Sequence, residues 1–210
     1  MKKYISKLHF LTQDLPNRTH LEQVQLACEA GANWIQYRCM SKSDEEMLKE
    51  LHPIASVCDD WGATLIITDH SHLVDLADIQ GVHIEDMEAD LSLIRNEIGE
   101  SKTLGASANN IDQIKKHISN DVDYIGLGPF AHTDTKPNNY SHLGVFGYEQ
   151  IIEELNKSAL NIPLIAVGGI NLQNVTGLLA TGIYGIAVSS AFNKSESPKQ
   201  MYKQFHQLIF

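Results

Sequence analysis

The residues best suited to chemistry follow a short apolar run in the stretch DYIGLGPFAHTDTK. The run Tyr124–Leu127 is typical of a buried strand, and a Gly-Pro pair ends it. The loop beyond carries the hydroxyls of Thr133 and Thr135 and the ammonium group of Lys136. Two hydroxyls and a cation in one loop are suited to binding an oxyanion, and we expect that anion to be a phosphate.

Two later stretches, PLIAVGGI and GIAVSS, repeat the order of an apolar strand followed by small or hydroxyl residues. In the first, Gly168 and Gly169 would let the backbone approach a phosphate, and a helix expected from Leu172 would add N–H groups. In the second, Ser189 and Ser190 would complete the cradle. Either motif alone is explained by a tight turn and a helix cap. At two consecutive strand ends, they favour a phosphate site.

Arg38 lies two residues after Gln36, so both side chains point to the same side of one strand. A guanidinium group can bind two oxygens of a phosphate. An inward-facing arginine can equally pair with a neighbouring carboxylate. The residue pattern leaves both readings open for Arg38.

Carboxylates follow two neighbouring strands, with Asp69 after one and Asp86 and Glu88 after the next. Carboxylates from adjacent strand ends can hold Mg²⁺ through oxygen ligands. Helix capping is the alternative. Capping by Asp90 and Glu88 would begin the next helix, whereas Asp69 ends a strand and is expected to act as a ligand.

Histidine and cysteine give no diagnostic motif. His70 and His72 could join His83 in a zinc site, but no familiar ligand spacing occurs. His70, His83 and His132 could serve proton transfer, and no Ser/His/Asp or Cys/His nucleophile stands out. The three cysteines are odd in number and lack C-x-x-C spacing. We expect small core residues in a reducing cytoplasm.

The elements that must position these residues form an alternating series. Eight runs rich in Val, Ile and Leu are predicted strands: Lys7–Thr12, Trp34–Arg38, Thr64–Asp69, Gly81–Glu85, Thr103–Ser107, Tyr124–Phe130, Pro163–Gly168 and Gly185–Ser190. Amphipathic stretches between them are predicted helices: His20–Ala30, Asp44–Asp60, Asp90–Ile98, Asn110–Ser119, Tyr148–Asn156 and Leu172–Ala180. This order predicts a single α/β domain over residues 1–210, a (β/α)8 TIM barrel. A doubly wound sheet is the alternative, but no G-x-G-x-x-G follows the first strand.

Composition limits the partners. The formal net charge of -10 argues against a nucleic-acid or anionic-membrane surface. No run is long enough to span a membrane, and the N-terminal apolar run is too short for a secretory signal. A small anionic ligand is compatible with this charge, because local cations and backbone N–H groups can oppose the overall field. Together with the phosphate motifs, this favours small phosphorylated substrates, and a homo-oligomer is compatible with the sequence.

The chain resembles the thiamine-phosphate synthase (thiamine-phosphate pyrophosphorylase) family. The matching pieces, in order, are GANWIQYR, LIITDHSHL, QGVHIEDMEADL, TLGAS, DYIGLGPFAHTDTK, IPLIAVGGI and GIYGIAVSSAF. The resemblance implies a (β/α)8 barrel and a Mg²⁺-dependent transferase. Its substrates would be 4-amino-5-hydroxymethyl-2-methylpyrimidine diphosphate and 4-methyl-5-(2-hydroxyethyl)thiazole phosphate, which give thiamine phosphate and diphosphate.

The resemblance also implies roles by position. It gives Gln36, Arg38, Thr68, Ser107 and Lys136 to the pyrimidine diphosphate side, with Arg38 and Lys136 as the catalytic cations. It makes Asp69 and Glu88 the ligands of Mg²⁺. The residues that would bind the thiazole phosphate are Thr133, Thr135, Gly169, Ser189 and Ser190.

Three positions depart from the family pattern. Met40 stands where the family has lysine, Thr68 where it has asparagine, and Glu88 where it has aspartate. All three lie on the pyrimidine diphosphate side, where Lys42 could replace the lost charge if its loop bends inward.

Two other functions remain open. One is the related thiazole tautomerase branch, which carries a histidine where this chain has Pro129, although His132 is close. The other is a thiazole-phosphate-binding protein with weakened or lost catalysis, for which Met40 is the best support.

Overall fold

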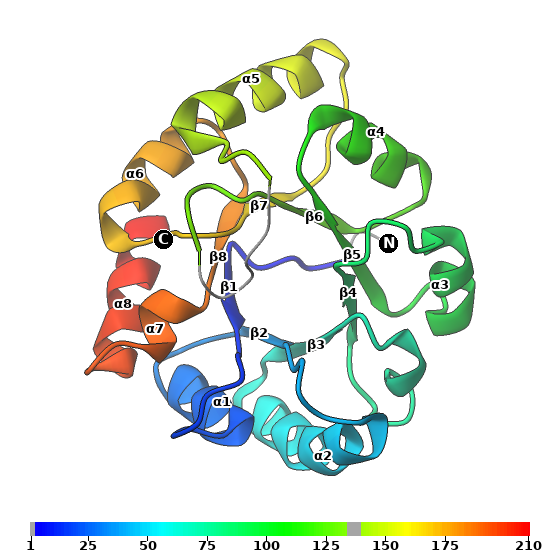
Figure 1. Ribbon diagram of the computed structural model, residues 1–210, viewed down its shortest axis with the longest axis vertical. Helices are drawn as coiled ribbons and strands as arrows, with labels where there is room; N and C mark the ends of the chain where they lie inside the picture. Colours follow the sequence, from blue (N-terminus) through cyan, green and yellow to red (C-terminus); the bar gives the residue numbers. More distant parts are fainter. Residues whose placement is uncertain (1–2, 134–139) are drawn as a thin grey trace.

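The computed structural model describes residues 3–133 and 140–210, and in this part of the chain eight parallel strands close into a barrel (Figure 1). The strands are β1 Leu8–Leu11, β2 Trp34–Tyr37, β3 Thr64–Thr68, β4 Gly81–Ile84, β5 Thr103–Ala108, β6 Tyr124–Leu127, β7 Leu164–Ala166 and β8 Gly185–Val188. Each pairs with the next, and β8 pairs with β1 through Ile186 and Leu8. The predicted (β/α)8 barrel is confirmed, and closure rules out an open doubly wound sheet.

Helices surround the barrel and cover the outer face of the strands (Figure 1). They are α1 His20–Glu29, α2 Asp44–Trp61, α3 Leu91–Ile98, α4 Ile111–Ser119, α5 Gly144–Lys157, α6 Leu172–Ala180, α7 Ser190–Asn193 and α8 Pro198–Ile209. A three-residue 3₁₀ turn, η1 Ser71–Leu73, lies between β3 and β4. The six predicted helices are all present. Among the described residues, no helix is long and apolar enough to cross a membrane.

Local sequence signals explain where several helices begin. The side chain of Ser43 accepts the N–H of Glu46, and that of Asn171 accepts the N–H of Gln173, at the starts of α2 and α6. Asp90 caps α3 through the N–H groups of its first turn, as expected. These caps set the lengths of the loops that follow the strands.

The core has two parts. A large apolar layer lies between strands and helices, and α8 adds Tyr202 and Phe205 to it. A smaller cluster, which includes Trp34, Tyr124 and Ile165, fills the inside of the barrel. The ring of His9 stacks on Trp34 at 4.4 Å between centroids and meets Tyr124 edge-on. This packed floor leaves the carboxyl ends of the strands for the site.

Candidate active site

One cavity at the carboxyl ends of the strands gathers residues from most of the barrel. Its lining includes six of the predicted site residues: Arg38, Ser107, Thr133, Gly169, Ser189 and Ser190. The apolar part of the lining includes Leu11, Pro129, Val167 and Ile170. A cavity with apolar walls and few polar groups is the usual form of a small-molecule site.

The glycine pair after β7 brings the backbone close to the neighbouring strand-end loop. Gly168 and Gly169 have φ values of 88° and 68°, which favour glycine. A Cβ atom on Gly169 would lie 2.6 Å from the carbonyl oxygen of His132. The pair therefore permits a close approach that no other residue type allows, and Ser189 and Ser190 lie on the same cavity. The predicted cradle residues are brought together in space.

Arg38 pairs with Glu85 in the lining of the cavity. Its Nε donates to Oε1 at 3.0 Å and its Nη2 donates to Oε2 at 3.1 Å. The side chains are only 8% and 11% exposed. Of the two readings left open for Arg38, the structure shows the carboxylate pair. This pair uses two of five guanidinium N–H groups, so the group retains donors for an anion.

A smaller pocket lies deeper in the barrel, toward the aromatic floor. Gln36 lines it and donates from Nε2 to the hydroxyl of Thr68 at 2.9 Å. His83 links the floor to the cavity, because one ring nitrogen contacts the Tyr124 hydroxyl and the other contacts Ser107 Oγ, each at 3.0 Å. The hydrogen-bonded side chains hold Gln36 and Ser107 in fixed orientations.

The predicted metal ligands lie on the loops after β3 and β4. Asp69 Oδ1 accepts the backbone N–H of Glu85 at 2.6 Å and that of Asp86 at 3.3 Å, which ties the two loops together. Glu88 is exposed, and its N–H donates to Asp86 Oδ1. This oxygen-only donor set fits the preference of Mg²⁺.

The condition under which Lys42 could replace the missing lysine charge is not met in the structure. Met40 is 69% exposed. Lys42 does not bend inward, because its Nζ lies 2.6 Å from Glu50 Oε2. Lys42 therefore does not supply the charge that Met40 lacks. Thr135 and Lys136 lie outside the described residues.

His70, His72 and His83 do not lie together as a zinc site, in agreement with the absence of a familiar ligand spacing. His70 and His72 both contact Asp44, whereas His83 lies inside the barrel. His132 is exposed, and its ring meets His142 edge-on. All three cysteines are buried and free of disulfides, as expected.

Sequence reasoning missed several cavity residues. Glu85 was noted at the end of β4 but had no assigned partner, and Asn109 and Tyr140 were not singled out. Asn109 donates from Nδ2 to the carbonyl oxygen of Gly128, so it joins the ends of β5 and β6. Its position just after a predicted strand was the available signal.

A closed (β/α)8 barrel with a glycine pair after β7 and two serines after β8 on one cavity has the arrangement common to barrel enzymes that act on phosphorylated molecules. Comparison with known proteins narrows this class. The family model described as thiamine monophosphate synthase matches residues 8–192. The chain therefore belongs to the thiamine monophosphate synthase family, and it is an enzyme of the transferase class.

Individual relatives support the assignment. Thiamine-phosphate synthase of Flavobacterium psychrophilum is 33% identical over 97% of this chain and 99% of its own length. That of Bacteroides fragilis is 33% identical over 94% of this chain and 97% of its own. The solved thiamine phosphate pyrophosphorylase of Pyrococcus furiosus superposes with a TM-score of 0.84 at 26% identity, over 97% of this chain and 95% of that one.

Proposed function

We propose that the protein joins 4-amino-5-hydroxymethyl-2-methylpyrimidine diphosphate to 4-methyl-5-(2-hydroxyethyl)thiazole phosphate, with release of diphosphate. The observation that carries the proposal is one cavity containing both Arg38 and the Gly169, Ser189 and Ser190 cradle. A reaction between two phosphorylated molecules needs two anion sites that face one space. Family membership supplies the chemical identity of the two partners.

On the thiazole side, the cradle would hold the phosphate so that the ring reaches the cavity. Gly169 supplies backbone at close range, and Thr133, Ser189 and Ser190 supply hydroxyl groups. Thr135 completes the set proposed for this phosphate. Anchoring by the phosphate fixes the direction of the reacting ring nitrogen, which lowers the entropic part of the barrier.

On the pyrimidine side, Arg38 and Lys136 would bind the diphosphate. Arg38 keeps N–H groups beyond those used by Glu85, so it can hold an oxygen of the leaving group without losing its partner. Ser107 and Gln36 would face the pyrimidine from the deeper wall. These donors stabilise negative charge as it develops on the departing diphosphate.

Asp69 and Glu88 would hold Mg²⁺, which neutralises diphosphate charge when it is bound. Asp69 is oriented for ligation by the backbone N–H groups of Glu85 and Asp86. Glu88 has one more methylene than aspartate and lies at an exposed position, so it can adjust its reach.

A two-substrate assay tests the function. Purified protein with both substrates and Mg²⁺ should give thiamine phosphate and diphosphate in equal amounts, and chelation by EDTA should stop the reaction. Asp69→Asn should lower kcat at least tenfold. Tight binding of the thiazole phosphate without any Mg²⁺-dependent turnover at high enzyme concentration would overturn the proposal in favour of a binding protein.

A further inference from the structure

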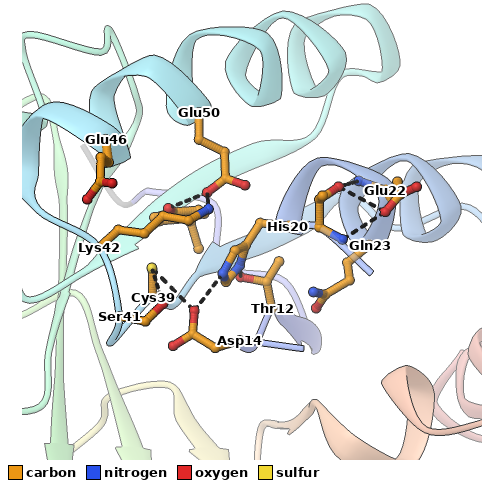
Figure 2. Close-up of polar contacts among 12 residues, drawn as sticks. Thr12, Asp14, His20, Glu22, Gln23, Cys39, Ser41, Lys42, Glu46 and Glu50 are labelled. Carbon is orange, nitrogen blue, oxygen red and sulfur yellow. Dashed lines mark hydrogen bonds and ion pairs between the residues drawn. The ribbon is translucent and has the colours of Figure 1, made fainter. Parts of the chain in front are cut away.

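A second cluster of ligand-type side chains, Asp14, His20 and Cys39, lies where the loops after β1 and β2 meet the start of α1 (Figure 2). Asp14 follows β1, His20 opens α1, and Cys39 follows β2. One ligand atom of each lies within 4.8 Å of those of the other two. Asp14 Oδ1 lies 3.0 Å from His20 Nε2 and 3.3 Å from Cys39 Sγ. The mechanism proposed above uses none of these three side chains.

We propose that Asp14, His20 and Cys39 form a Zn²⁺ site. Zinc bonds of about 2.3 Å to sulfur, 2.05 Å to nitrogen and 2.1 Å to oxygen in a tetrahedron would separate the N–O and S–O pairs by about 3.4 and 3.6 Å. The observed separations are shorter by less than half an ångström. A small outward movement of Asp14, whose side chain is 33% exposed, admits the ion.

Neighbouring groups already orient the ligands. The other ring nitrogen of His20, Nδ1, lies 2.7 Å from the hydroxyl oxygen of Thr12. The other carboxylate oxygen of Asp14 accepts the N–H of Met40 at 2.9 Å. Each contact directs Nε2 and Oδ1 toward the shared centre, as partners outside the ligand set do in zinc proteins. Two of the three proposed ligands are therefore held in orientation by hydrogen bonds from outside the cluster.

The donor set selects the kind of metal. Sulfur, nitrogen and oxygen ligands together suit Zn²⁺, whereas Mg²⁺ prefers oxygen alone. Thiolate and carboxylate would together balance the charge of the ion.

The proposed zinc site lies next to Arg38 in the chain, so a bound ion would affect the loops that hold this arginine. Cys39 directly follows Arg38, and the Arg38 N–H donates to Thr12 Oγ1, which also contacts His20. A bound ion would link the loop after β1 to Cys39, the residue that follows this arginine. His20 and Cys39 are nearly fully buried, while Asp14 faces solvent. Three protein ligands leave the fourth position to water.

A second group, Asp44, His70 and His72, provides a control within the same chain. Its ligand atoms also lie within 4.8 Å of one another. However, its side chains are 33% to 51% exposed and it contains no sulfur. Asp44→Asn therefore removes a competing surface site and leaves the proposed site intact.

Metal content and Co²⁺ spectra test the proposal. Full-length protein that is freed of metal and then loaded with Zn²⁺ should retain the ion through gel filtration. In titration calorimetry, Asp14→Asn and Cys39→Ser should each lower the Zn²⁺ affinity at least tenfold. Co²⁺ should produce thiolate-to-metal charge-transfer absorption in the wild type, in Asp44→Asn and in Cys28→Ser, but not in Cys39→Ser. Asp14→Asn changes a solvent-facing group, so it decides the affinity test if Cys39→Ser misfolds.

Three results would overturn the proposal. They are no retained zinc in the wild type, unchanged zinc affinity in Asp14→Asn, and a charge-transfer band that survives in folded Cys39→Ser. Zinc lost only in Asp44→Asn would place the metal on the exposed histidines instead. Because each readout is metal binding and not turnover, failure here is distinct from failure of the proposed transferase function.

Discussion

Arg38 and Glu85 form a bidentate ion pair between the ends of β2 and β4, with both side chains about nine-tenths buried. The pair closes one side of the cavity and fixes the guanidinium before any ligand arrives. A partly buried pair of this kind costs more to break than an exposed one, because each partner has lost its water.

Removing the carboxylate from this pair should destabilise the protein. We expect Glu85→Gln to lower the free energy of unfolding by about 3 kcal/mol, because the Arg38 charge stays buried without its counter-ion. Arg38→Met combined with Glu85→Gln should cost less than the sum of the single changes. Urea denaturation of the four proteins measures this coupling, and strict additivity would contradict it.

Restoring a positive charge at position 40 should improve binding of the diphosphate substrate. Met40 is 69% exposed, so Met40→Lys should change stability by less than about 0.5 kcal/mol. A charge-assisted contact is worth about 1.5 kcal/mol or more, which corresponds to roughly a tenfold lower KM for the pyrimidine diphosphate. Leu93→Lys adds the same charge at an exposed position on α3, and its KM should not change. Equal effects of the two variants would show that only net charge matters.

The barrel could be predicted because its signals are local. Apolar runs mark the strands, and caps such as Ser43 and Asn171 mark helix starts. Between β3 and β4 the chain forms only the short turn η1 in place of a full helix. The last helix, α8, was not predicted. This helix buries Tyr202 and Phe205, and Met201 and Ile209 pack partly buried against the same core.

Pairing across the barrel could not be predicted in the same way. The sequence placed Arg38 and Glu85 at strand ends, but which carboxylate meets the guanidinium depends on strand tilt and side-chain reach. The Asp14, His20 and Cys39 cluster shows the same limit more strongly. Its members come from two loops and a helix start with no recognisable spacing, so only folding brings them together.

Substitution of Gly169 by alanine, compared with the same change at Gly62, should distinguish two contributions to stability: the positive φ value and the close contact of the new Cβ atom. Gly169 and Gly62 have nearly equal φ values, 68° and 65°, so alanine meets a similar penalty of about 1 kcal/mol at each. Only at Gly169 does the new Cβ meet a neighbour, the His132 carbonyl oxygen at 2.6 Å. Gly169→Ala should therefore be the more destabilising change in thermal unfolding.

The same pair of variants also reports on the cradle. Gly169→Ala should raise the KM for the thiazole phosphate at least tenfold, because the displaced backbone no longer fits the phosphate. Gly62→Ala lies at the end of α2 and should leave this KM unchanged. A Gly169→Ala enzyme with normal KM would remove Gly169 from the phosphate site.

His9 should make the protein less stable in mild acid. Burial, with a smaller contribution from the charge of His83, lowers the pKa of His9 from 6.5 to about 3. In the unfolded chain, His9 therefore becomes protonated near pH 6.5, whereas in the folded chain it becomes protonated only near pH 3. Stability is full above pH 6.5 and falls as the pH drops through this window, by about 2 kcal/mol at pH 5 relative to pH 8.

His9→Phe tests this pH dependence, because phenylalanine keeps a ring against Trp34 but does not titrate. The variant loses the contact between His9 Nε2 and the Ser6 carbonyl oxygen, so it should be less stable than the wild type at pH 8. Between pH 8 and pH 5, however, its free energy of unfolding should fall by about 2 kcal/mol less than that of the wild type. The other histidines contribute to both proteins and cancel in this difference. Urea denaturation at the two pH values measures it, and parallel losses in both proteins would mean that His9 is protonated in the folded barrel.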